Sequence, residues 1–198
     1  MKTDTLIKLE TKSLILEPPD IRFAQDVLEY SNDPEFCRYI DAKPAADIEE
    51  CKEFMKNLSE ENVKGKRASW VIVQKSEKKA IGTIGFIFKH ALRHKVAEIG
   101  YGLGRAYWGQ GLFQEAMKEV LKFGFEDLQL ERIQAIARED NQRAIKGIEK
   151  IGFIQEAVFK SFYETVEGRK NGVLLRILKE DFLEKFDKGE HHGTTRCR

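Results

Sequence analysis

The sequence is poor in cysteine, has no excess of charge of either sign and contains no long apolar run. Its three cysteines, Cys37, Cys51 and Cys197, are widely spaced and odd in number, which argues against a disulfide framework and a CxxC metal site. Thiols that stay reduced are typical of cytoplasmic proteins. No segment approaches the ~20 apolar residues of a membrane span, and residues 1–10 lack the apolar core of a signal peptide. We therefore expect a cytoplasmic protein with no bound metal and no membrane partner.

The charge balance argues against a nucleic-acid partner. Lys and Arg total 34 while Asp and Glu total 33, so the net charge is +1, and no basic surface for DNA or RNA is indicated. This balance is still compatible with a local basic patch for a phosphate-bearing ligand. The length of 198 residues fits one domain with its own core. We assign residues 1–186 to that domain and expect 187–198, a polar segment around His191 and His192, to be a flexible tail.

Local patterns predict strands and helices in a definite order. Short runs rich in β-branched and aromatic residues predict strands over 13–16, 70–73, 80–88, 96–103, 133–137, 153–159 and 173–178, the first at a sheet edge because prolines follow it. Apolar residues at helical spacing predict helices over 21–30, 48–58 and 112–128. Residues 141–151, which end at Gly152, and residues 179–186 are also expected to be helical. This order indicates an α/β (α+β) fold with a mixed, mostly antiparallel central sheet flanked by helices.

A glycine-bearing turn joins a predicted strand to the longest predicted helix, between Glu98 and Ala116. Backbone N–H groups at a helix N-terminus bind phosphate, and Gly109 and Gly111 would let a diphosphate approach the backbone closely. The motifs GxxxxGK[ST] and GxGxxG are absent from the sequence. The spacing alone supports two alternatives equally: a phosphate site, or a turn that needs glycine only for its backbone dihedral angles. Glu115, near the helix start, is expected to stabilise the helix through its dipole.

Four sequence segments occur in an order that a known family shares. They are AEIGY at 97–101, YWGQGLFQEA at 107–116, EDNQRA at 139–144 and EKIGF at 149–153. They resemble, in turn, a strand, the acyl-CoA pyrophosphate loop, an Asn-bearing turn and a helix end of the GNAT superfamily of N-acyltransferases. The similarity is greatest to its Rim-type branch, which resembles ribosomal-protein N-terminal acetyltransferases. The resemblance covers about residues 70–178 and implies a GNAT-type fold, acetyl-CoA as cosubstrate and direct acetyl transfer to a primary amine.

The resemblance also implies which residues hold acetyl-CoA. The loop amides that would wrap its diphosphate belong to Trp108, Gly109, Gln110, Gly111, Leu112 and Phe113. Tyr101 and Leu103 lie on the strand whose edge would pair with the pantetheine arm. Asn141 would contact the same arm, or serve only as a helix N-cap. Lys146 shares a helical face with two other basic residues, and this face would either meet CoA phosphates or be solvated.

Catalysis requires a group that takes the ammonium proton of the acceptor and a route that protonates the thiolate. The resemblance implies Glu98 as the base, and the alternative is a sheet-surface Glu in an ion pair. Ala144 stands where relatives carry a Ser regarded as a proton donor, so this role is unassigned. Tyr101, Tyr107, Tyr163 and water are the substitutes.

The acceptor is the least defined part of the prediction. Phe36, Tyr39, Phe54 and Trp70 would line its side of the fold or simply belong to the core. Asn171 stands where relatives often carry Asp, which leaves acceptor recognition open. The resemblance favours a peptide N-terminus, with a small amine such as a polyamine or a drug as the alternative.

Two readings from other functional classes stay open. One is a non-catalytic acyl-CoA-binding module, and the other is a structural domain whose glycine turn binds nothing. The sequence also leaves open whether the chain forms a homodimer through an edge strand.

Overall fold

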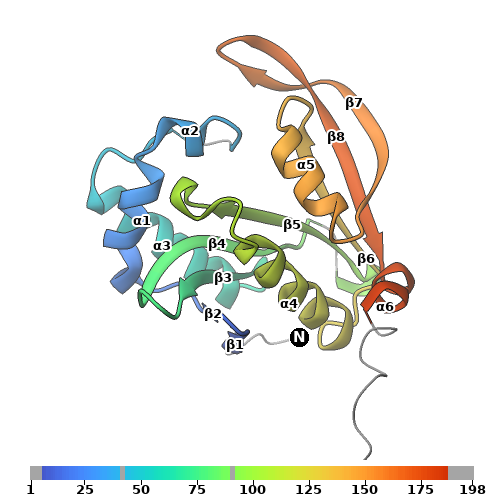
Figure 1. Ribbon diagram of the computed structural model, residues 1–198, viewed down its shortest axis with the longest axis horizontal. Coiled ribbons are helices and arrows are strands. Elements are labelled where there is room, and N and C mark those ends of the chain that lie inside the picture. The colour runs from blue at the N-terminus through green and yellow to red at the C-terminus, as the bar shows by residue number, and fades with distance from the viewer. Residues whose placement is uncertain (1–5, 41–42, 90–91, 187–198) are drawn as a thin grey trace, which may run out of the picture.

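An eight-stranded sheet organises the chain in the computed structural model, which describes residues 6–40, 43–89 and 92–186 (Figure 1). The strand order is β1-β2-β3-β4-β5-β6-β8-β7. All neighbouring strands are antiparallel except β5 and β6, which are parallel. The predicted mixed, mostly antiparallel sheet is therefore confirmed. The strands are β1 (Leu9–Glu10), β2 (Leu14–Glu17), β3 (Arg67–Gln74), β4 (Lys79–Ile87), β5 (Val96–Leu103), β6 (Arg132–Arg138), β7 (Ile154–Thr165) and β8 (Gly168–Leu178).

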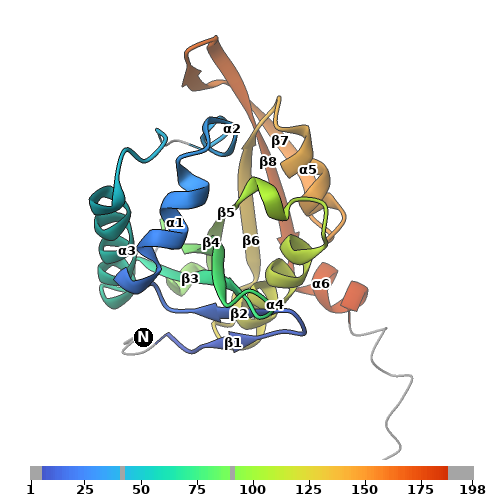
Figure 2. The ribbon, with the colours of Figure 1, turned by 60° about the vertical axis from the view of Figure 1, so that its left-hand side comes forward.

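Helices cover both faces of this sheet (Figure 2). They are α1 (Ala24–Ser31), α2 (Pro34–Cys37), α3 (Ile48–Val63), α4 (Leu112–Glu126), α5 (Gln142–Glu149) and α6 (Lys179–Phe186), with 3-10 turns η1 (Ile21–Phe23), η2 (Leu92–His94) and η3 (Arg105–Tyr107). Alternate side chains of β3 separate two cores. Val71 and Val73 pack with α1 and α3, whereas Trp70 and Ile72 belong to the larger core that contains α4, α5 and α6.

Three aspartates explain where the first helices begin. Asp20 accepts a hydrogen bond from the Arg22 N–H, Asp33 from the Glu35 N–H, and Asp47 from the N–H groups of the first turn of α3. Each carboxylate satisfies N–H groups that have no carbonyl partner within the helix. The predicted helix start at Asp20 is correct, although its first turn is the 3-10 turn η1.

Several predicted boundaries differ from the structure. The first predicted strand is not an edge strand, because β2 pairs with β1 as well as with β3. Helix α3 runs five residues past the predicted end at 58, because the polar side chain of Asn62 is buried and exchanges hydrogen bonds with the backbone of Ser69. β7 and β8 both extend into a hairpin whose exposed polar residues carry little apolar signal.

No helix among the described residues is long and apolar enough to cross a membrane. The described residues also hold no cluster of three or more His, Cys, Asp and Glu side chains suited to a metal ion. The single domain over 1–186 stays a prediction, and the predicted tail, 187–198, lies outside the described residues.

Candidate active site

The loop between β5 and α4 presents backbone N–H groups at a helix start. Gly109 and Gly111 adopt the left-handed conformation, with φ of 77° and 80°, which only glycine adopts without strain. Gly111 is the N-cap of α4 and supplies no side-chain hydrogen bond to the helix. The first N–H groups of α4, which have no carbonyl partner within the helix, therefore face the loop without a cap. This arrangement suits an anion.

The strands β5 and β6 separate where the loop approaches. They pair at only three positions, from Val96 opposite Arg132 to Glu98 opposite Gln134. β5 nevertheless continues to Leu103 and β6 to Arg138. The edge of β5 beyond Glu98 is thus not paired with β6, and an extended ligand can pair with it.

A cavity of about 860 Å³ lies beside this open edge. The loop, the end of β5, α5 and the α2 segment form its walls, and Figure 1 shows α2 and α5 facing each other above β5. Eight of the predicted cofactor residues line it: Tyr101, Leu103, Trp108, Gly109, Gly111, Phe113, Asn141 and Lys146. Two do not. Leu112 is buried in the core, and the Gln110 side chain donates to the Ala106 carbonyl at 2.8 Å.

Trp108 supports the loop through its side chain. Its indole N–H donates to the Leu103 carbonyl at 2.6 Å, and the Arg143 guanidinium lies 3.7 Å from the ring centroid, which is a cation–π contact. Its backbone N–H donates to the Arg105 carbonyl at 3.1 Å. That amide is engaged within the protein, contrary to its predicted place among the diphosphate donors.

The turn into α5 combines a structural cap with a basic face. The Asn141 side chain accepts from the Ala144 N–H at 3.2 Å, so it is the N-cap of α5, and it also lines the cavity. Arg143, Lys146 and Lys150 all line the cavity as well. The basic face of this helix therefore points to the cavity, which suits a ligand with several phosphates.

Phe113 is accommodated by two neighbours. Its ring packs against Tyr101, with 4.6 Å between ring centroids. A Cβ atom at Gly147 would lie 3.4 Å from the Phe113 ring, an ordinary van der Waals distance, so this part of α5 lies directly beside Phe113. Burial raises the pKa of the Tyr101 hydroxyl, because the charged phenolate loses its hydration. Tyr101 thus places a protonated hydroxyl beside the cavity.

Comparisons with known proteins agree with this geometry. Residues 13–154 match the model of the acetyltransferase (GNAT) domain family. The chain belongs to the GNAT acetyltransferase family. It is 30% identical over 175 residues to uncharacterized N-acetyltransferase p20 of Bacillus licheniformis, covering 88% of this chain and 97% of that protein. A GNAT-family acetyltransferase structure from Bacillus anthracis is 25% identical with a TM-score of 0.76, covering 88% of this chain and 99% of that one.

A solved ribosomal-protein acetyltransferase also shares this fold. The fold matches the ribosomal-protein-S5-alanine acetyltransferase of Vibrio fischeri with a TM-score of 0.77 at 20% identity, covering 89% of this chain and 98% of that one. GNAT enzymes use acetyl-CoA. The cavity fits this cosubstrate, because an uncapped helix start and three basic side chains on one wall are the donors that its phosphates require.

Glu98 of this acetyltransferase lies outside the lining of the cavity. Its carboxylate forms an ion pair with Lys89 at 2.9 Å. It shares a face of β5 with Gly100 and Gly102, and Gly102 lines the cavity. By the rise of a strand, the Cα atoms of Glu98 and Gly102 are about 13 Å apart. An amine near Gly102 would therefore be out of reach of direct contact with the Glu98 carboxylate.

Of the three candidate tyrosines, Tyr101 and Tyr107 line the cavity, and the hydroxyl groups of Tyr107 and Tyr163 are engaged within the protein. The Tyr107 hydroxyl donates to Glu77 at 3.0 Å, and the Tyr163 hydroxyl donates to the Ile136 carbonyl at 3.1 Å. Trp70 is 0% exposed and its ring contacts Phe123, so the core alternative holds for this residue.

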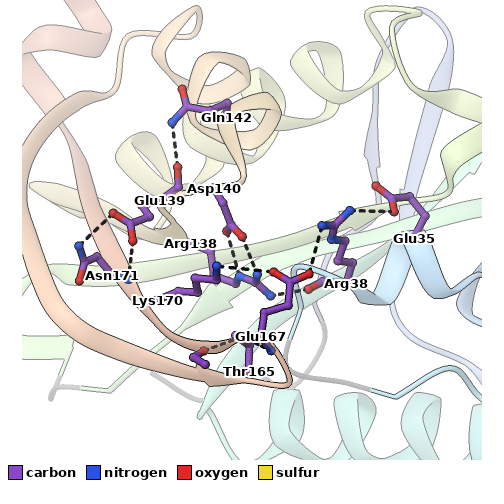
Figure 3. A network of polar contacts seen from close by, with 11 residues as sticks. Glu35, Arg38, Arg138, Glu139, Asp140, Gln142, Thr165, Glu167, Lys170 and Asn171 are labelled. Atoms are coloured by element: carbon purple, nitrogen blue, oxygen red, sulfur yellow. Dashed lines mark hydrogen bonds and ion pairs between the residues drawn. The ribbon is translucent and has the colours of Figure 1, made fainter.

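A polar network holds the α2 wall of the site in place (Figure 3). The Arg138 guanidinium donates to both carboxylate oxygens of Asp140, at 3.0 and 2.7 Å, and to the Arg38 carbonyl at 2.7 Å. The Tyr39 ring contacts the guanidinium groups of both arginines. Asn171 donates through its side chain to Glu139 at 2.9 Å. This asparagine thus joins β8 to the turn before α5.

Sequence reasoning missed several cavity residues, among them Glu35, Ile40 and Gly147. Glu35 and Ile40 come from a segment that carries none of the family-like motifs. Gly147 lies within a predicted helix, and a glycine inside a helical pattern is the signal that could have marked a close contact.

Proposed function

We propose that this chain transfers the acetyl group of acetyl-CoA directly to a primary amine. The observation that carries the proposal is one cavity bounded by the uncapped start of α4, the unpaired edge of β5 and the basic face of α5. Acetyl-CoA supplies the acetyl group as a thioester. The amides from Gly109 to Phe113, together with Lys146, would hold its diphosphate, and β5 would hold its extended arm near Tyr101 and Leu103.

The chain's own groups would move two protons. The acceptor ammonium must first lose a proton, and we assign this step to Glu98 acting through water, with Glu35 as the other carboxylate near the site. The nitrogen–carbon bond then forms as the carbon–sulfur bond breaks. The thiolate takes a proton from the Tyr101 hydroxyl, and the nitrogen gives its second proton to the resulting phenolate, which restores the hydroxyl. No covalent bond to the protein is needed.

The acceptor that we favour is a protein N-terminal α-amine. The likeness to a ribosomal-protein-S5-alanine acetyltransferase supports this class. A small-molecule amine is the second candidate, because p20 is named only as an N-acetyltransferase.

Thermal unfolding with acetyl-CoA, and with NAD and ATP as controls, tests cofactor binding. A ligand at about 100 times its Kd adds about 2.7 kcal/mol of stability, which for a chain of this size raises Tm by roughly 5–11 °C. Gly111→Glu should abolish this shift by placing a carboxylate where the diphosphate binds. Gly168→Glu is the matched control, since Gly168 also has a positive φ and open space around it, but lies at the tip of the β7–β8 hairpin.

Release of free CoA thiol in the presence of an amine panel then tests catalysis. Turnover with any amine supports the enzyme. Stabilisation by acetyl-CoA without thiol release from any amine would instead indicate a non-catalytic acyl-CoA-binding module, and no stabilisation would indicate a structural domain.

The base is tested separately by the pH dependence of the rate. Glu98→Gln should remove the acidic limb of the kcat/KM profile, whereas Glu131→Gln, which breaks the exposed pair with Lys95, should not. An unchanged profile for Glu98→Gln would refute the assignment, and loss of the limb in Glu35→Gln would move the role to Glu35.

A further inference from the structure

A second cavity opens from the first one. It has a volume of about 370 Å³ and lies between α1, α3 and the strands β3, β4 and β5. The two cavities share Phe36, Ile40, Tyr101 and Gly102. A group held at this junction therefore lies next to both cavities at once. We call the second cavity the acceptor pocket.

The walls of the acceptor pocket are mainly apolar. The apolar residues that carry this character are Val27, Phe36, Ile40, Phe54, Leu58 and Ile84. Two of them, Ile40 and Phe54, are large hydrophobic residues with 37% and 43% of their surface exposed. Exposed apolar side chains at the opening of a pocket are typical of a binding site for an apolar group.

The charged residues of the lining disfavour a polycation. They are Lys43, Glu50 and Arg67, two cations and one carboxylate. Glu50 already accepts a hydrogen bond from the Ala46 N–H at 2.9 Å, and Arg67 pairs with Glu61, which is not part of the lining. The one carboxylate of the lining is already hydrogen-bonded, so a second positive charge on the acceptor would lack a carboxylate to pair with.

We propose that the acceptor is a primary amine with one compact apolar substituent and no second positive charge. This inference rests on the proposed acetyl transfer. The amine lies at the junction beside Tyr101 and Gly102, while the substituent enters the acceptor pocket. The volume is at the low end of the ~300–1,000 Å³ typical of small-molecule pockets, so it fits a single apolar side chain or ring. A free aralkyl amine and a peptide N-terminus with an apolar first residue share this chemistry.

Thiol release with matched amines tests the proposal on the full chain. Phenethylamine should show a kcat/KM at least tenfold above ethanolamine, which has the same charge but no apolar group, and above spermidine. Phe-Gly-Gly amide against Lys-Gly-Gly amide repeats the comparison for peptides. The better of the two apolar substrates identifies the source of the acceptor.

A pair of variants on α3 locates the specificity in the acceptor pocket. Phe54→Asp should lower kcat/KM for phenethylamine by roughly tenfold and raise the relative rate with spermidine. Val63→Asp introduces the same carboxylate on the same helix, at a residue that is 75% exposed and outside the pocket lining, so it should change neither rate. The Tm shift with acetyl-CoA reports that each variant is folded and binds the cosubstrate.

The possible failures are distinguishable. If spermidine or ethanolamine is acetylated as efficiently as phenethylamine, or if Phe54→Asp behaves like Val63→Asp, the inference is wrong while the acetyltransferase stands. If no amine releases thiol, the proposed function itself fails, and the inference with it.

Discussion

The variant Asp140→Asn tests the network that holds the α2 wall. Arg138 is only 8% exposed, and the Asp140 side chain is 30% exposed. Removing the charge leaves a nearly buried guanidinium with the Arg38 carbonyl as its remaining strong acceptor. Breaking a fully buried pair costs about 3–5 kcal/mol, whereas an exposed pair contributes about 0–1 kcal/mol.

Because Asp140 is partly exposed, we expect a loss between these limits, about 2–3 kcal/mol. For a chain of 198 residues, this lowers Tm by roughly 4–12 °C. Glu156→Gln is the matched control, because it breaks a guanidinium–carboxylate pair with Arg132 on the same strand, β6, with Glu156 40% exposed. We expect the control to lose about 1 kcal/mol or less.

The pH dependence gives an independent check. Hydrogen bonds from Arg138 lower the pKa of Asp140 below its ordinary value of 3.8, against an opposing effect of burial. A carboxyl whose pKa is lower in the folded state stabilises the fold above the ordinary pKa and loses this contribution as the pH falls through the lowered one. The stability difference between the native chain and Asp140→Asn should therefore be full at pH 7 and shrink below about pH 4.

Urea or thermal unfolding at pH 7 and pH 3 measures both effects. Equal Tm losses for Asp140→Asn and Glu156→Gln at pH 7, or a difference that does not shrink in acid, would refute this account of the network.

Three further predictions concern the site and its support. Glu115→Gln should lower the free energy of unfolding in urea by about 1–2 kcal/mol, because the carboxylate accepts hydrogen bonds from the Thr11 hydroxyl at 2.5 Å and the Ser13 N–H at 2.6 Å. An unchanged free energy would mean that Glu115 acts only through the helix dipole. Asn141→Ala should lower the free energy of unfolding by about 1 kcal/mol, because the helix cap is lost. Asn141→Ser keeps the cap and should lower only the affinity for acetyl-CoA, measured by calorimetry. An unchanged affinity in Asn141→Ser would mean that Asn141 serves only as the cap. Tyr101→Phe should reduce kcat by about a hundredfold at unchanged Tm, and full turnover would exclude its hydroxyl as the acid.

Local sequence signals determined the scaffold of the site. The bounds of β5 and of α6 coincide with the predicted ones, and the glycine turn does lead into a long amphipathic helix, α4. These features depend on residues that are close in the sequence, so a short stretch of sequence is enough to predict them. The GNAT family itself was also readable, because its motifs are contiguous stretches.

Only the tertiary structure decided what individual side chains do. Glu98 forms an ion pair with Lys89, and Trp70 lies in the core. The indole of Trp108 contacts Leu103 and Arg143, a role that its sequence motif did not predict. Contacts such as Glu115 with Thr11, or Arg138 with Arg38, join residues about 100 positions apart. Such pairs form because the sheet order brings distant segments together, and no local pattern of apolar and polar residues encodes which partner a charged side chain will meet.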